Sequence, residues 1–294
     1  MINLTKTEYL ELRNRGRENN DGYQFRSHNN PQKVIETISS EMPSDFFDAR
    51  MYTINLLLQN REALKEIQIL LPDDIVSVDS FVKGWQRDFI EGKNLRKIIY
   101  DPKVPIETKI SLLKQVGQLL RKMSMTRKNT HINNFYYNDL HEGNFIVDYQ
   151  GIIHGIDVGS CKILDNTPTM ALYPSLLSQS NSCPQKYQRN TQKCTYGATI
   201  IPDENLDIYC YIMMILGFMY GKQFDELKKD TLIEYLDYLE FYGGNLEFLE
   251  IISRIYDAKI DNTNPDYLLD YIKEIYPYSN YHYDKGNSLS KILR

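Results

Sequence analysis

The sequence predicts an α+β fold with a small strand-rich first part and a larger, mainly helical second part. Residues 1–92 combine short extended runs with one clear helix, whereas from residue 101 onward apolar residues recur at helical spacing. Two short apolar strands interrupt the second part at residues 145–153. Because 294 residues exceed the usual size of a single core, we expect one large domain or two closely packed lobes, 1–92 and 93–294.

The first part should contain one helix and one hairpin. Residues 44–60 repeat apolar side chains at steps of three and four, with Ser44 as the expected N-cap. Residues 67–71 and 75–82 are rich in β-branched and aliphatic side chains, and the Pro-Asp-Asp sequence at 72–74 has turn chemistry. The buried stripe of the helix should hold Phe47, Met51, Ile54 and Leu58.

The second part opens with a helix predicted at residues 106–123, for which Pro105 is a favourable first-turn residue. Residues 145–147 and 152–153 should pair as a hairpin around the turn at 148–151. A polar segment interrupted by prolines, residues 162–202, has the length of a functional loop. Further helices are expected at residues 206–219, 231–241, 246–256 and 267–275.

Charge and composition exclude several classes of protein. The formal net charge of −5 and the pI near 5.6 give no basic face that would neutralise nucleic-acid phosphates. The four cysteines form no CxxC pair, which favours reduced thiols. The longest apolar run, residues 208–220, is shorter than the roughly 20 residues that a membrane-spanning helix requires. We therefore expect a cytoplasmic protein with no membrane span and no nucleic-acid partner.

Residues that suit phosphoryl transfer are concentrated between positions 137 and 159. Asp139 lies five residues before Asn144, a short strand follows at once, and Asp157-Val-Gly159 comes thirteen residues after Asn144. Phosphoryl transfer needs a carboxylate that orients the attacking hydroxyl and oxygen ligands that hold Mg²⁺ on the nucleotide. Asp139, Asn144 and Asp157 can supply both functions.

This D-x-x-x-x-N pattern followed by D-x-G resembles the catalytic and metal-binding loops of the protein-kinase-like superfamily. The resemblance implies a bilobal fold that binds ATP between the lobes, with Asp139 as catalytic base and Asn144 and Asp157 as magnesium ligands. His141 stands where many protein kinases have a lysine that contacts the γ-phosphate. The sequence D-L-H-x-x-N is similar to that of small-molecule members such as aminoglycoside and choline kinases.

The same resemblance suggests the residues that would bind the nucleotide. Residues 89–95 look like the hinge between lobes, so that the backbone from about Arg87 to Phe89 would meet the adenine edge. Gly22, together with Gly16, would cover the phosphates. The phosphate-binding lysine would be Lys33, or an acid, Glu36, would stand at that position in an alternative register.

Two further features of the resemblance concern regulation and rigidity. The usual H-R-D is Tyr137-Asn138-Asp139 here, so a phosphorylated loop lacks its usual arginine partner and activity should not depend on loop phosphorylation. Asp207 would accept backbone N–H bonds from the catalytic loop, or would simply favour the N-terminus of its own helix.

The expected function is transfer of the ATP γ-phosphate to a hydroxyl group. The interval of about fifty residues from Asp157 to Asp207 gives room for a platform that binds an extended peptide, so a serine/threonine protein kinase ranks first. A small-molecule kinase ranks second. A pseudokinase that acts as a nucleotide-binding scaffold is the third alternative, because the glycine-rich loop is degraded.

Overall fold

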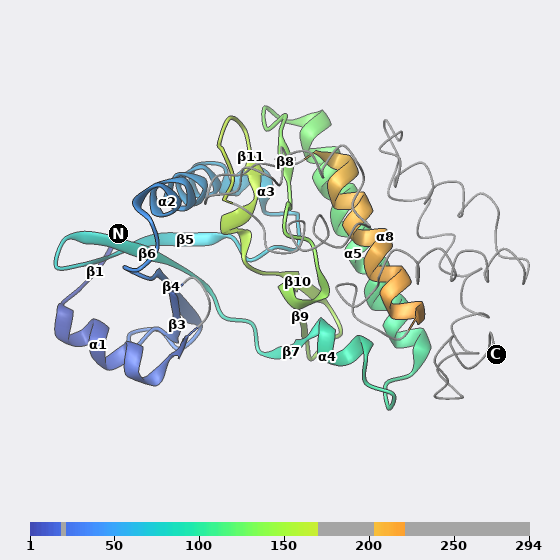
Figure 1. The fold of residues 1–294 in the computed structure, drawn as a ribbon, viewed down its shortest axis with the longest axis horizontal. Coiled ribbons are helices and arrows are strands. Elements are labelled where there is room, and N and C mark those ends of the chain that lie inside the picture. The colour runs from blue at the N-terminus through green and yellow to red at the C-terminus, as the bar shows by residue number, and fades with distance from the viewer. Residues whose placement is uncertain (19–21, 170–202, 221–294) are drawn as a thin grey trace, which may run out of the picture.

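The computed structural model describes residues 1–18, 22–169 and 203–220. It has an α+β fold in which a six-stranded sheet, built from residues 2–88, is joined to a part with longer helices and two small sheets (Figure 1). The helices expected at 231–241, 246–256 and 267–275, and most of the segment 162–202, lie outside the described residues.

The six-stranded sheet is mixed. Its strand order is β1-β5-β6-β4-β3-β2, and all neighbouring pairs are antiparallel except β1 and β5, which run parallel. The strands are β1 (Ile2–Leu4), β2 (Arg17–Glu18), β3 (Gly22–Arg26), β4 (Lys33–Ile38), β5 (Pro72–Val78) and β6 (Phe81–Asp88).

Helices cover the two faces of this sheet, α1 (Lys6–Arg15) on one and α2 (Ser44–Gln59) on the other (Figure 1). Side chains alternate between the faces of a strand. Ile35 of β4 therefore joins a small apolar cluster with α1, whereas Ile38 and Trp85 join the main core with α2. By the same alternation, Glu36 of β4 and Arg87 of β6 lie on the face toward α2.

The hairpin of the first part differs from the prediction. The strands meet at Asp79-Ser80, not at residues 72–74, and both turn residues have positive φ, 47° and 70°. Two successive left-handed residues give a turn whose twist matches that of the flanking strands. Pro72 opens β5 and Asp73 lies at an irregularity in its pairing with β6, so that turn-forming residues are accommodated at the start of the strand.

Helix α2 confirms the predicted helix, but its N-cap is Pro43, and no side chain caps it by a hydrogen bond. Its buried face is also wider than the predicted stripe. Besides Met51 and Ile54 it contains a buried charged residue, Arg50. The short α3 (Arg61–Leu64) follows.

The second part begins at β7, which follows the last strand of the large sheet and belongs to a three-stranded sheet with β9 and β10. Its helix α5 starts after Pro105 as predicted, and β9 and β10 form the predicted antiparallel hairpin around Gly151, which has a φ of 78°. A two-stranded sheet, β8 with β11, flanks them. The elements are β7 (Gly92–Asn94), α4 (Leu95–Ile99), α5 (Ile106–Asn129), β8 (Phe135–Tyr136), η1 (Glu142–Asn144), β9 (Phe145–Asp148), β10 (Ile153–Gly155), η2 (Val158–Ser160), β11 (Lys162–Ile163) and α8 (Glu204–Tyr220).

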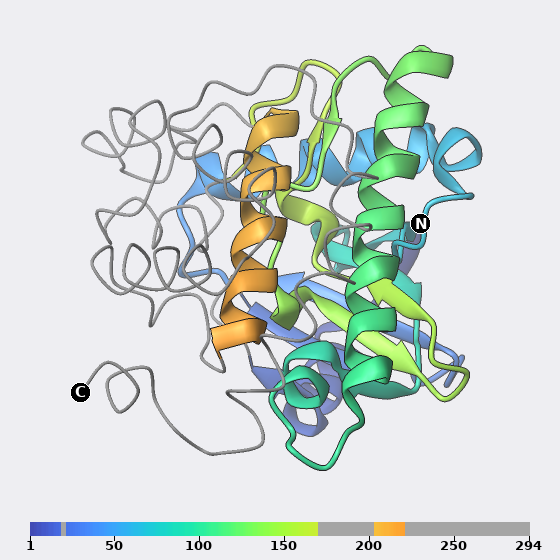
Figure 2. The same cartoon turned by 90° about the vertical axis from the view of Figure 1, so that its right-hand side faces the viewer.

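Helices α5 and α8 lie side by side, as both views of the fold show (Figures 1 and 2). The hydroxyl of Tyr211 donates a hydrogen bond to the carbonyl of Leu113 at 2.9 Å. In α8 the described side chains from Leu206 to Phe218 are buried, as expected for an apolar helix inside the fold. Among the described residues, no helix has both the length and the apolar character needed to cross a membrane.

Candidate active site

The loop after β8 brings Asp139 and Asn144 together. The amide of Asn144 donates to the carboxylate of Asp139 at 3.2 Å and to the backbone carbonyl of the same residue at 2.9 Å. Both residues are largely buried, with 6% and 7% of their surface exposed. The loop therefore closes on itself, and one amide holds the orientation of the candidate catalytic carboxylate.

The β9–β10 hairpin returns the chain to this loop. At the end of the hairpin, the N–H of Ile156 donates to the carbonyl of Asn144 at 2.8 Å. This hydrogen bond places Asp157 beside Asn144, the other proposed metal ligand. Asp157 has a left-handed backbone with φ of 58°, and its side chain is 40% exposed. Backbone conformations of this kind are costly and persist where the surroundings require them.

A buried tyrosine lies beneath both loops. The hydroxyl of Tyr137 lies within hydrogen-bonding distance of the carbonyls of Asn144 and Ile156, and its ring stacks on Phe145 with centroids 5.6 Å apart. Burial raises the pKa of Tyr137 well above its usual value, and the negative charge of nearby Asp157 and Asp139 acts in the same direction. The phenol therefore stays neutral and fixes the spacing of the two loops.

Asp207 of α8 anchors the loop from the other side. Its carboxylate accepts the backbone N–H groups of Tyr137 at 2.7 Å and Asn138 at 2.9 Å, which confirms the predicted hydrogen bonds to the loop. Burial raises the pKa of Asp207 to about 7, although the two N–H bonds lower it. Asn138, with a φ of 68°, also donates its side-chain amide to the carbonyl of Ser160 at 2.8 Å.

His141 faces the candidate base. Its Nδ1 accepts the N–H of Gly143 at 3.0 Å, and its Nε2 lies 3.9 Å from a carboxylate oxygen of Asp139. Arg96 approaches the same Nδ1 at 3.5 Å and the fully buried carboxylate of Glu142 at 3.4 Å. These contacts fix the orientation of the imidazole next to Asp139.

The donors at this site suit magnesium. Among the described residues, no three His, Cys, Asp or Glu side chains form a group that could hold a metal ion. Mg²⁺, however, is commonly held by one or two carboxylates together with phosphate oxygens and water. Asn144 and Asp157 lie on adjoining loops linked by a 2.8 Å backbone hydrogen bond, and they offer an amide oxygen and a carboxylate.

Lys33 does not have the surroundings expected of a phosphate-binding lysine. The register pairs it with Asp88 on the face of the sheet to which Ile35 also belongs, which is the face toward α1. Its ammonium group is bound by the carboxylates of Asp73 and Asp88, the latter at 2.7 Å. Glu36, the residue that the alternative register would put at the lysine position, faces α2.

Glu36 has its own counter-ion. The guanidinium of Arg87 contacts its carboxylate at 2.6 Å, and Gln24 donates to the same oxygen at 2.7 Å. Arg87 is 6% exposed and its backbone lies within β6, paired with Val34 and Pro72. The backbone of Arg87 is therefore paired with strands on both sides within the sheet, where an adenine edge would have to compete with these strands.

Two other predicted nucleotide-binding residues have structural partners. The N–H of Phe89 donates to the carbonyl of Gln32 at 2.7 Å, so the sheet already uses the group expected to meet adenine. Gly22 lies in β3, where an added Cβ would come within 1.9 Å of the carbonyl oxygen of Thr37. The close approach of the two strands explains this glycine without a phosphate, and residues 19–21 beside it lie outside the described part.

Arg50 of α2 is the site residue that the sequence analysis missed. Its Nη1 lies 3.3 Å from the carboxylate of Asp157 and 2.7 Å from the hydroxyl of Ser160, and the side chain is 5% exposed. The signal was present in the sequence, because Arg50 falls four residues from both Phe46 and Ile54 within an apolar stripe. A charged residue in such a position requires a buried partner.

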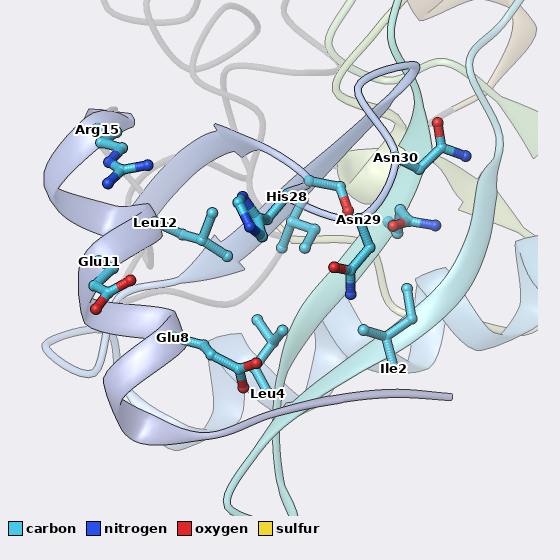
Figure 3. A pocket seen from close by; sticks show the side chains of 12 residues that line it. Ile2, Leu4, Glu8, Glu11, Leu12, Arg15, His28, Asn29 and Asn30 are labelled. Atoms are coloured by element: carbon cyan, nitrogen blue, oxygen red, sulfur yellow. The ribbon is translucent and has the colours of Figure 1, made fainter.

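A pocket of about 330 Å³ lies elsewhere, on the α1 face of the large sheet (Figure 3). Leu12 and Ile35 contribute apolar lining, and Glu8, Arg15 and His28 contribute polar groups. None of its lining residues belongs to the loops around Asp139 and Asp157. The pocket is therefore separate from the candidate active site.

Sequence comparisons add no family to this description. No protein-family model matches the chain, and no curated protein matches it. The chemical argument therefore depends on the residues themselves.

Proposed function

We propose that this protein is an ATP- and magnesium-dependent phosphotransferase with a bilobal protein-kinase-like fold. The observation that carries the proposal is the loop in which Asp139 and Asn144 are hydrogen-bonded to each other, Asp157 is brought alongside, and Asp207 anchors the backbone. Residues separated by up to 70 positions converge here, which a chance match to a short motif would not require.

The arrangement of the large sheet and helices supports the same proposal. Residues 1–92 supply a sheet with α2 against one face, and residues 93–294 include the long α5 and the loops that carry the acids. The boundary near residue 92 coincides with the start of β7, which pairs with β9 of the second part. A nucleotide between the two parts would lie beside Asp157.

Catalysis by this site would be positioning and charge neutralisation. Asp139 accepts a hydrogen bond from the hydroxyl of the acceptor and receives its proton as the phosphate is transferred. Asn144 and Asp157 are the residues that would hold magnesium, which when bound neutralises charge on the phosphates. The amide of Asn144 keeps the carboxylate of Asp139 oriented, and the imidazole of His141 lies beside it, with Nε2 at 3.9 Å.

A hydroxyl of a protein is the proposed acceptor, and a serine/threonine protein kinase is the first candidate. This choice depends on the long interval between Asp157 and Asp207, because an extended peptide needs a platform. A small-molecule hydroxyl is the alternative, favoured by the D-L-H-x-x-N sequence at residues 139–144.

One observation favours a second function, that of a nucleotide-binding scaffold without turnover. The only strand lysine in β4, Lys33, is bound to Asp73 and Asp88 on the face toward α1, whereas the strand residue that faces α2 is the acid Glu36. A kinase that lacks the strand lysine has lost a contact to its phosphates. Measured transfer of phosphate from ATP distinguishes a phosphotransferase from a nucleotide-binding scaffold.

The test compares phosphate transfer from γ-labelled ATP by wild type, Asp139→Asn and the matched control Asp165→Asn, an exposed aspartate outside the site. Protein acceptors and aminoglycoside or choline acceptors are assayed in parallel. We expect about a thousandfold loss for Asp139→Asn and none for Asp165→Asn, because general base catalysis contributes 10²–10⁴-fold. Nucleotide binding by wild type without any transfer would establish the scaffold.

A further inference from the structure

Arg50 connects α2 to the loop that carries the proposed metal ligand. A single nitrogen, Nη1, contacts both the carboxylate of Asp157 and the hydroxyl of Ser160. The side chain also packs against Gly159, where an added Cβ would lie 2.6 Å from Cδ of the arginine. The close packing of the arginine therefore explains the glycine of the D-x-G sequence.

The charges on the α2 face of the sheet make this arginine distinctive. Glu36 and Arg87 form a pair with side chains only 13% and 7% exposed, so the strand contributes no net charge toward α2. Lys33 is directed to the other face and held by two carboxylates. Among the described residues of β4, β6 and α2, Arg50 is the cation in contact with the loop of Asp157.

An ion pair with a metal ligand has a consequence for binding order. A carboxylate that already faces a guanidinium attracts a divalent cation less, because the two cations repel each other across it. A nucleotide triphosphate adds negative charge that both cations can share. Arginine binds phosphate oxygens well, since its planar group donates several N–H bonds.

We propose that Arg50 is the phosphate-binding cation of this nucleotide site, supplied by helix α2 in place of a strand lysine, and that Asp157 holds its charge until nucleotide and metal bind together. The inference rests on the proposed function and deepens it. It assigns to Arg50 two effects of opposite sign: the arginine strengthens nucleotide binding and weakens the binding of metal alone.

The test measures ATP binding in the presence of Mg²⁺ by calorimetry and the binding of Mn²⁺ alone by electron paramagnetic resonance. For Arg50→Gln we expect ATP binding about tenfold weaker or more, because a charge-assisted contact is lost, and Mn²⁺ binding tighter than in wild type. Arg50→Lys keeps the charge but loses the planar group, so its ATP affinity should fall by less than about tenfold. Lys33→Gln, the matched control on the other face, should leave both affinities unchanged.

The outcomes separate the two proposals. If wild type binds no ATP, the proposed function and this inference both fail. If wild type binds ATP and Arg50→Gln binds it equally well, only the inference fails. Weaker ATP binding without tighter Mn²⁺ binding would indicate a merely structural arginine and overturns the proposal. Should Arg50→Gln not fold, a tenfold loss of ATP affinity in Arg50→Lys contradicts it instead.

Discussion

The loops around Asp139 and the strands around Lys33 differ in what holds their polar residues in place. In the loops, backbone groups of neighbouring residues fix the geometry, as when the amide of Asn144 bonds to the carbonyl of Asp139 at 2.9 Å. In β4 the position of a residue along the strand determines its environment, because Glu36 and Lys33 lie on opposite faces of one sheet. Spacing along the chain therefore predicts the first arrangement, whereas the second depends on strand register.

The largest effect on stability should come from the anchor of the loop. Asp207→Ala leaves the buried N–H groups of Tyr137 and Asn138 without their acceptor, and we expect the free energy of unfolding to fall by about 4 kcal/mol. Asp203→Ala, which removes an N-terminal hydrogen bond of the same helix to Leu206, should cost about 1 kcal/mol. Urea denaturation of both variants measures the difference. Equal losses would show that the anchor is no more than a helix cap.

The buried pair on the strands should come next. Glu36→Ala leaves the guanidinium of Arg87, 7% exposed, without its carboxylate, and we expect a loss of about 3 kcal/mol. Lys33→Ala removes a more exposed cation and should cost about 1 kcal/mol. Thermal and urea unfolding of the two variants test the assignment of faces. A larger loss for Lys33→Ala would mean that the faces are reversed.

The titration of Asp207 gives a smaller, pH-dependent effect. Because burial raises the pKa of Asp207 from 3.8 to about 7, the folded state keeps a proton between these pH values that the unfolded state has lost. Its contribution to the free energy of unfolding therefore decreases as the pH rises through this window and is constant above it.

The measurement is the stability of wild type minus that of Asp207→Asn, which cannot titrate there. This difference should be larger at pH 5 than at pH 8, changing by about 1.4 kcal/mol or less for each pH unit. A difference that is independent of pH would show that Asp207 is ionised throughout.

The smallest effect concerns the turn of the β9–β10 hairpin. Gly151→Ala places a side chain at a φ of 78°, with no heavy atom within 4 Å, so only backbone strain opposes it. We expect a cost of about 1 kcal/mol in urea unfolding, and less for Gly151→Asn, because asparagine tolerates left-handed backbone. If both variants match wild type, backbone strain contributes nothing at this turn.

The two hairpins show how far the sequence predicts this fold. The hairpin around residue 150 was predicted correctly because a glycine with positive φ lies between two short apolar strands. The hairpin of β5 and β6 was placed seven residues too early, because Pro72-Asp73-Asp74 has turn chemistry but Asp79 and Ser80 adopt the left-handed conformation. Local composition does not show whether residues 72–74 or residues 79–80 form the turn, because the pairing of the whole strands determines it.

The candidate site shows the same division. Spacing made Asp139, Asn144 and Asp157 the candidates, and the resemblance to protein kinases predicted that Asp207 accepts N–H bonds from the loop. Arg50 was missed because its partner lies 107 residues away, and the choice between Lys33 and Glu36 required the strand register. Long-range pairing and face assignment are properties of the folded chain.

The anchoring of the loop by α8 has a consequence for how the protein is made. The acceptor for the N–H of Tyr137 is contributed by a residue 70 positions further along the chain. During synthesis the loop therefore emerges well before its acceptor, and closure over such a distance is a slow step. The loop that carries Asp139 gains its final backbone hydrogen bonds only when α8 docks beside α5.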